Sequence, residues 1–200
     1  MVGQQQKIVS DHFQQATNNV ASAPLLEGIA QNIKTYSAKA VTGTEQDKLA
    51  FVNGILDQLG VGKAGDLKTA TDLMEKNMAQ LAKNSPAATD AARVVNQLAS
   101  PHPTMNKEAI KEAADQIIGQ VRMSKDIYKS FLPHMLRGDQ AGYLDKLDKM
   151  SGITDARVWQ FEALDKAGQA AMLSKMTPED LASFRQTVER AEAMGFFGKQ

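Results

Sequence analysis

The chain has 200 residues, of which 42% are hydrophobic and 6% aromatic, and it balances 23 basic against 23 acidic residues. This length suits one large domain or two small ones, and the balanced charge gives no strong field to attract nucleic acid or an anionic membrane. The absence of cysteine excludes disulfides, zinc–cysteine sites and thiol catalysis. No apolar run approaches the roughly 18 residues of a membrane span, so we expect none.

Helical signals recur along the chain, whereas alternating Val, Ile and Thr runs typical of strands are missing. We therefore predict an all-α fold, a multi-helix bundle of about eight to ten short helices with no sheet. Much of the hydrophobic fraction is alanine, which buries less apolar area than Leu or Phe. The core is expected to be thin, or to be completed by neighbouring subunits.

The first half of the chain divides into two parts. Residues 1–22 are polar and rich in Gln and Asn, and we interpret them as a helix that packs on a partner or as a frayed segment. Residues 23–100 form an N-terminal helical part. Its helix starts are marked by capping residues or prolines at Pro24, Thr44 (with Asp47), Asp66 and Pro86.

Two prolines in Ser100-Pro-His-Pro-Thr104 disfavour helix, so residues 101–105 are predicted as a linker or turn before a C-terminal helical part, residues 106–200. Asn106 caps the longest helix, which Pro133 is expected to end or kink near Leu132. Shorter helices follow, with expected positions from Gly138-Asp139, over Asp155–Leu164 and over Ala170–Met176.

The last helix has the most complete local signature. Thr177 is a natural N-cap, Pro178 fits the first turn, and Asp180 completes a capping-box pattern. Gly195 stops the helix, and Phe196-Phe197 follow as an apolar plug. Between these ends, helical spacing places four apolar residues on one face: Leu181, Phe184, Val188 and Ala191.

The glycine-rich stretch Gly60-Val-Gly-Lys-Ala-Gly65 has the letters of the dinucleotide-binding fingerprint. That fingerprint needs a preceding strand, and residues 49–59 are helical by their period. We interpret the stretch as a helix C-cap followed by a flexible turn.

The three histidines are His12, His102 and His134, and none lies three or four residues from another. No helix therefore presents a histidine pair to a metal, and we expect surface or capping roles. His102 lies between two prolines and is expected to be exposed. His134 follows Pro133 and is expected near a helix C-terminus, where a cation is favoured.

No other constellation indicates chemistry. Asp145 and Asp148 alternate with lysines, which is typical of a solvated helix face with local ion pairs. Glu27 lacks the neighbourhood of a lytic transglycosylase glutamate, and no G-x-S-x-G elbow marks a nucleophile. We therefore assign no catalytic, cofactor-binding or metal-binding residue, and predict no cofactor.

Aromatic residues gather in the last quarter of the chain, where we expect them to form the hydrophobic centre of the C-terminal part: Trp159, Phe161, Phe184, Phe196 and Phe197. The ten methionines are interpreted chiefly as adaptable core fillers, among them Met74 and Met78.

Three C-terminal segments resemble the C-terminal ends of virion structural proteins of tailed phages and prophages. These are Arg157-Val-Trp-Gln-Phe-Glu-Ala-Leu164, Met176-Thr-Pro-Glu-Asp-Leu-Ala-Ser-Phe184 and Ala191-Glu-Ala-Met-Gly-Phe196. A looser similarity extends over residues 45–200. The resemblance implies a non-enzymatic virion component, internal (ejection) or tail-associated, with no catalytic residues to carry over. Its implied partners are portal, tail or core proteins and further copies of the chain.

Two alternatives remain open from the sequence. One is a fragment of a peptidoglycan-degrading enzyme that acts at phage entry, which needs a carboxylate pocket. The other is a bacterial helical adaptor or secreted effector, which the polar N-terminal residues would suit.

Overall fold

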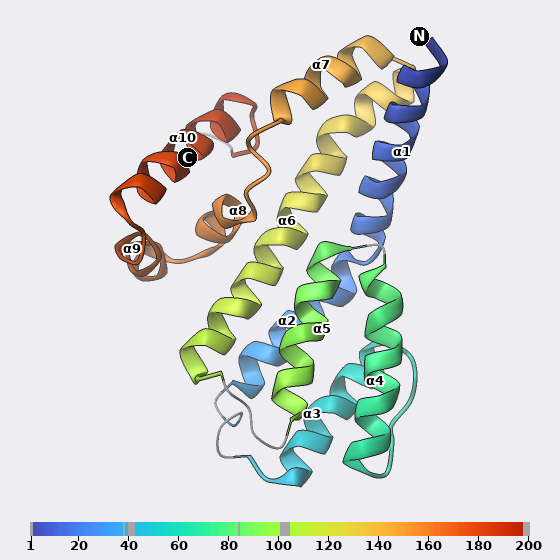
Figure 1. Ribbon diagram of the computed structural model, residues 1–200, viewed down its shortest axis with the longest axis vertical. Coiled ribbons are helices and arrows are strands. Elements are labelled where there is room, and N and C mark those ends of the chain that lie inside the picture. The colour runs from blue at the N-terminus through green and yellow to red at the C-terminus, as the bar shows by residue number, and fades with distance from the viewer. Residues whose placement is uncertain (1, 38, 40–42, 84, 101–104, 198–200) are drawn as a thin grey trace. The chain divides into compact units, whose positions relative to one another are not determined.

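The computed structural model of the chain describes residues 2–37, 39, 43–83, 85–100 and 105–197. Over these residues the regular structure consists of ten α-helices without a strand (Figure 1), so the predicted all-α fold is confirmed. The helices are α1 (Val2–Ala21), α2 (Ala23–Tyr36), α3 (Glu45–Gln58), α4 (Leu67–Ala82), α5 (Pro86–Ala99), α6 (Lys107–Arg137), α7 (Gln140–Met150), α8 (Ala156–Ala163), α9 (Lys166–Ser174) and α10 (Pro178–Ala193).

The chain divides into two compact units. The core unit is Asn18–Val121, and the terminal unit combines Met1–Thr17 with Arg122–Gln200. These limits fall inside α1 and α6, and so differ from the sequence-based ranges 1–22, 23–100 and 106–200. The difference has a packing cause, because the first half of α6 buries apolar side chains together with α2–α5. Residues 101–104 of the predicted linker lie outside the described residues.

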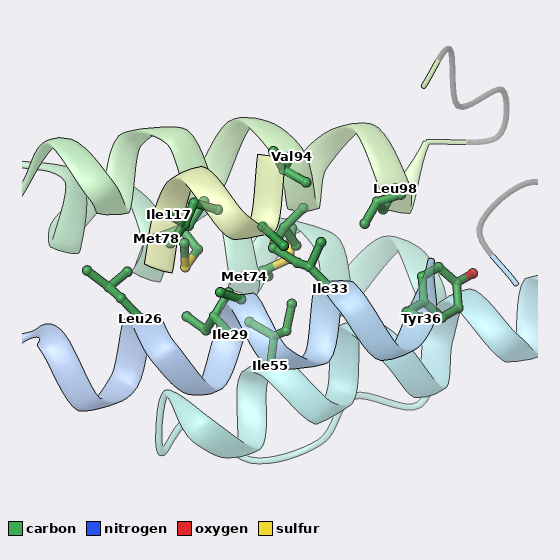
Figure 2. Close-up of a cluster of buried hydrophobic side chains, with 14 of the residues drawn as sticks. Leu26, Ile29, Ile33, Tyr36, Ile55, Met74, Met78, Val94, Leu98 and Ile117 are labelled. Atoms are coloured by element: carbon green, nitrogen blue, oxygen red, sulfur yellow. The ribbon is translucent and has the colours of Figure 1, made fainter. Parts of the chain in front are cut away.

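The core unit is built around one apolar cluster. Helices α2–α5 and the first half of α6 all contribute to it, and Figure 2 shows Ile33 of α2 and Met74 of α4 among its side chains. Alanine is frequent in the cluster, as expected, and lets helix backbones approach closely. Fully buried members labelled in Figure 2 include Leu26, Ile29, Ile33, Ile55, Met74, Met78, Val94, Leu98 and Ile117.

Local capping chemistry sets most helix starts. In α3, Thr44 Oγ1 accepts from the Asp47 N–H at 3.2 Å while the Asp47 carboxylate accepts from the Thr44 N–H at 3.0 Å, which completes a capping box. Asp66 accepts from Thr69 N at 2.9 Å and Asn106 from Ala109 N at 2.8 Å. These predicted starts are confirmed, because each cap satisfies backbone N–H groups that the first turn leaves unpaired.

Of the two outcomes expected at Pro133, an end or a kink of the helix near Leu132, the end is wrong. The helix continues to Arg137 with Pro133 inside it. Gly138, at a φ of +65°, and the N-cap Asp139 close it instead. A proline costs a helix one hydrogen bond, and the burial of Phe131 just before it favours retaining the helical path.

Helix α9 begins at Lys166, four residues before the expected start at Ala170. Asp165 caps it by accepting from the Gly168 N–H at 2.8 Å. The capping residue Asp165 was therefore visible in the sequence. The first turn of α9 has no large apolar residues at helical spacing, so its start was missed.

The described residues of the terminal unit form two apolar clusters. One joins Val9 of α1 to Phe131 and Tyr143. The other surrounds Trp159 and Phe184, and it confirms the predicted aromatic centre, with Phe161, Phe196 and Phe197 partly buried against it. Trp159 is 1% exposed and donates through Nε1 to Asp126 Oδ2 at 3.0 Å, which ties α8 to α6.

Candidate functional site

The most elaborate polar arrangement among the described residues lies at the corner between α6 and α7, inside the terminal unit. One oxygen of Asp139 lies 2.8 Å from His134 Nδ1, and the other accepts from the Gly142 N–H at 2.9 Å. The Asp139 N–H in turn donates to the His134 carbonyl at 2.9 Å. One aspartate thus closes the end of α6 and the start of α7 together.

The hydrogen bonds at this corner set its electrostatics. The Gly142 N–H, followed by His134, holds the pKa of the Asp139 carboxyl below its ordinary value. The carboxylate therefore stays ionised at neutral pH and favours a proton on Nδ1 of His134, which leaves Nε2 as the acceptor of the neutral ring. His134 lies in the last turn of α6, the place expected for a cation-bearing side chain.

A cavity of about 250 Å³ opens beside the His134–Asp139 pair. Such a volume is slightly below the usual range for small-molecule pockets. Its wall combines amide, hydroxyl and imidazole groups with apolar surface, which can hold a small polar molecule by hydrogen bonds. The lining residues are Gln6, Val9, Ser10, His134, Met135, Gly138, Asp139, Gln140 and Tyr143. Over the described residues no group of three or more His, Asp and Glu side chains could hold a metal ion.

Gly142 makes room for the Asp139–His134 pair. A Cβ atom at this position would lie 2.7 Å from His134 Nδ1 and closer still to Asp139. We expect Gly142→Ala to lower the free energy of unfolding by about 1–3 kcal/mol, since the carboxylate must shift and expose an uncapped helix start. Urea unfolding measures the change.

Gly54→Ala is the matched control, because its Cβ would meet only the Asn32 amide at 3.8 Å. Because Gly54 lies inside α3, this substitution should raise the free energy of unfolding by about 0.5–1 kcal/mol. A stabilising Gly142→Ala would contradict the steric account of the corner.

His12 of α1 contacts Tyr143, one of the residues that line the cavity, and the neighbouring Phe131. His12 Nδ1 lies 2.6 Å from the Tyr143 hydroxyl, and the His12 ring stands edge-on to Phe131 with centroids 5.0 Å apart. Burial lowers the pKa of His12 and raises the pKa of Tyr143 to about 12. The expectation of a surface or capping role for His12 is therefore wrong, because a contact across 131 residues leaves no local signal. His102 lies outside the described residues.

A shallower hollow of about 270 Å³ lies between α2 and α3 in the core unit. Tyr36 and Phe51 line it and stack on each other with ring centroids 4.3 Å apart. Lys39 and Asp47, which also line it, form an ion pair at 3.2 Å. The Asp47 carboxylate already caps α3 through Thr44, so the hollow's charged groups serve local structure.

The glycine-rich loop of residues 60–65, expected to be a flexible turn, is hydrogen-bonded to α3 at Ala64. The Asn53 side chain accepts from Ala64 N at 2.8 Å and donates to Ala64 O at 3.0 Å. Helix α3 precedes the loop, as predicted. The carboxylate of Asp66 caps α4 at the position where a nucleotide phosphate would have to bind, so the loop is no dinucleotide site.

Asn53→Ala should lower the free energy of unfolding by about 1–3 kcal/mol, because both Ala64 backbone groups lose their partner. Amide hydrogen exchange over residues 61–65 should rise in parallel. Unchanged exchange there would show that the loop does not depend on Asn53.

The other sequence candidates stay apart from these hollows. Asp145 pairs with Lys149 at 2.6 Å on an exposed face of α7, as expected for a solvated face with local ion pairs. Glu27 lies in α2 and lines neither hollow. Among the described helices none is both long and apolar enough to cross a bilayer.

Comparisons with models of known families, with curated proteins and with solved structures find no match to this chain.

Proposed function

We propose that this chain is a non-enzymatic structural protein of a tailed-phage virion. It acts as an internal (ejection) or tail-associated component, through protein–protein contacts in an oligomeric assembly. Its partners are portal, tail or core proteins and further copies of the chain. It is made in the host cytoplasm and resides in the virion.

The observation that carries this proposal is the meeting of the three segments that bear the phage resemblance. Trp159, from the first segment, contacts Phe196, from the third, with ring centroids 5.5 Å apart. Phe161 contacts Phe184, from the second segment, also at 5.5 Å. The resemblance thus covers one packed module rather than scattered helix starts, which supports reading it as a shared structural unit.

Apolar side chains left accessible support a role in protein contacts. Leu136, at the end of α6, is 78% exposed, and Ile8 on α1 is 47% exposed. These two side chains are accessible for contact with a neighbouring protein.

Peptide mass spectrometry on purified phage particles, before and after triggered DNA release, tests the proposal. Peptides that are present before release and lost afterwards would establish an ejected internal protein. Peptides retained in the empty particle would indicate a tail or shell position instead. The portal protein, retained in both samples, is the loading control.

Absence of the chain from both samples would overturn the virion proposal. Light scattering coupled to size-exclusion chromatography tests the oligomer separately. A monomer at all concentrations examined would exclude self-association of the isolated chain.

A further inference from the structure

Three side chains of α1 pack against α6 and α7 within the terminal unit. Val9 is buried beside Phe131 and Tyr143. Phe13 stacks on Tyr128 with centroids 5.5 Å apart. Between them lies His12, whose imidazole makes the 2.6 Å hydrogen bond to the Tyr143 hydroxyl. A titratable group therefore stands in the middle of an otherwise apolar and aromatic contact.

The direction of this hydrogen bond follows from burial. Tyr143 is fully buried, and burial keeps its phenol protonated because its pKa is raised to about 12. If the imidazole donated, the phenol proton of this fully buried side chain would have no partner among the hydrogen bonds of the described residues, at a cost of about 1–3 kcal/mol. The hydroxyl therefore donates, and His12 accepts through Nδ1 with its proton on Nε2.

The groups around His12 do not favour a positive charge there. On α7, Lys146 lies over the Phe131 ring that His12 also contacts, with Nζ 6.0 Å from the ring centroid. The Asp139 carboxylate of the neighbouring corner is already engaged by His134.

The remaining acidic side chains of α1, α7 and the second half of α6 face outward or pair elsewhere. Asp11, next to His12 on α1, is exposed. On α7, Asp145 pairs with Lys149, and on α6, Lys129 lies 3.9 Å from Asp126. An imidazolium at position 12 would therefore be half-buried without a carboxylate partner.

We propose that the His12–Tyr143 pair is an acid-sensitive latch, which holds residues 2–17 of α1 on α6 and α7 at neutral pH and releases them in mild acid. Protonation removes the Nδ1 lone pair that accepts from Tyr143 and adds an unpaired charge. The released segment returns the imidazole to water, where the charged form is solvated.

The pH range in which docking weakens follows from the direction in which burial moves the pKa of His12. Burial lowers the pKa of the docked His12 below its ordinary 6.5, so the released state binds more protons. The stability of docking is fully present above about pH 6.5 and declines as the pH falls below it, by at most tenfold per pH unit for one proton.

Hydrogen exchange with mass spectrometry on the whole chain tests the latch. After correction for intrinsic exchange rates, opening of residues 5–17 should rise about three- to tenfold between pH 7.5 and pH 5.5. His12→Asn should abolish this rise, because the amide oxygen takes the place of Nδ1 as acceptor and does not titrate. His134→Asn is the matched control and should retain it.

Equal opening at both pH values in the wild type would overturn the proposal, as would a rise that survives in His12→Asn. If His12→Asn releases residues 2–17 of α1 at every pH, the variant cannot test the latch. An NMR titration of the His12 imidazole in the wild type then tests it. A midpoint clearly below 6.5 supports the latch, and one at or above 6.5 overturns it.

Discussion

Replacing Trp159 with alanine is expected to lower the free energy of unfolding of the terminal unit by about 3–5 kcal/mol. Trp159 is 1% exposed, and its ring contacts both Phe196 and Phe197. Its loss leaves a cavity among α8, α10 and the residues after α10, and it removes the donor to Asp126. Transfer and cavity costs therefore add to an unmade hydrogen bond.

Hydrogen exchange over α8 and α10 measures this loss where it occurs, and urea unfolding followed by circular dichroism gives its size. Trp159→Phe is the matched control. It keeps an aromatic ring but loses the N–H, so we expect a smaller cost of about 1–3 kcal/mol. A loss below about 1 kcal/mol for Trp159→Ala would show that the cluster collapses around the gap or contributes little.

Ile33→Ala is expected to lower the free energy of unfolding of the core unit by about 2–5 kcal/mol. Ile33 is fully buried in the core unit's cluster, and Figure 2 shows it near the centre of the labelled side chains. Met74 and Met78 belong to the same cluster and are the side chains best able to fill part of the gap. How far they do so sets where the loss falls within this range.

Urea unfolding followed by circular dichroism measures the effect, with hydrogen exchange over α2 as the local readout. Ile33→Val is the matched control and should cost only about 0.5–1.5 kcal/mol, because it removes one methylene. Trp159 is the single tryptophan and belongs to the terminal unit, so its fluorescence follows that unit separately. Equal losses of unfolding free energy for Ile33→Ala and Ile33→Val would contradict a packing origin of the effect.

The helical fold and most helix limits were predictable from the sequence because their causes are local. A cap such as Thr44 with Asp47, or Asn106, acts on backbone groups two or three residues away. The aromatic centre around Trp159 was also predictable, since apolar residues at helical spacing must be buried somewhere. The virion role, by contrast, stays a proposal that depends on resemblance.

Contacts between residues far apart in the sequence were decided only by the tertiary structure. The His12–Tyr143 bond, the Asp126–Trp159 bond and the assignment of the first half of α6 to the core unit have no local signal. Pro133 shows that local and tertiary effects can compete within one helix. Proline disfavours continuation of a helix, yet α6 continues through Pro133 to Arg137, beside the buried Phe131. Sequence period determines that a helix has an apolar face, whereas burial of that face depends on which helix the chain brings against it.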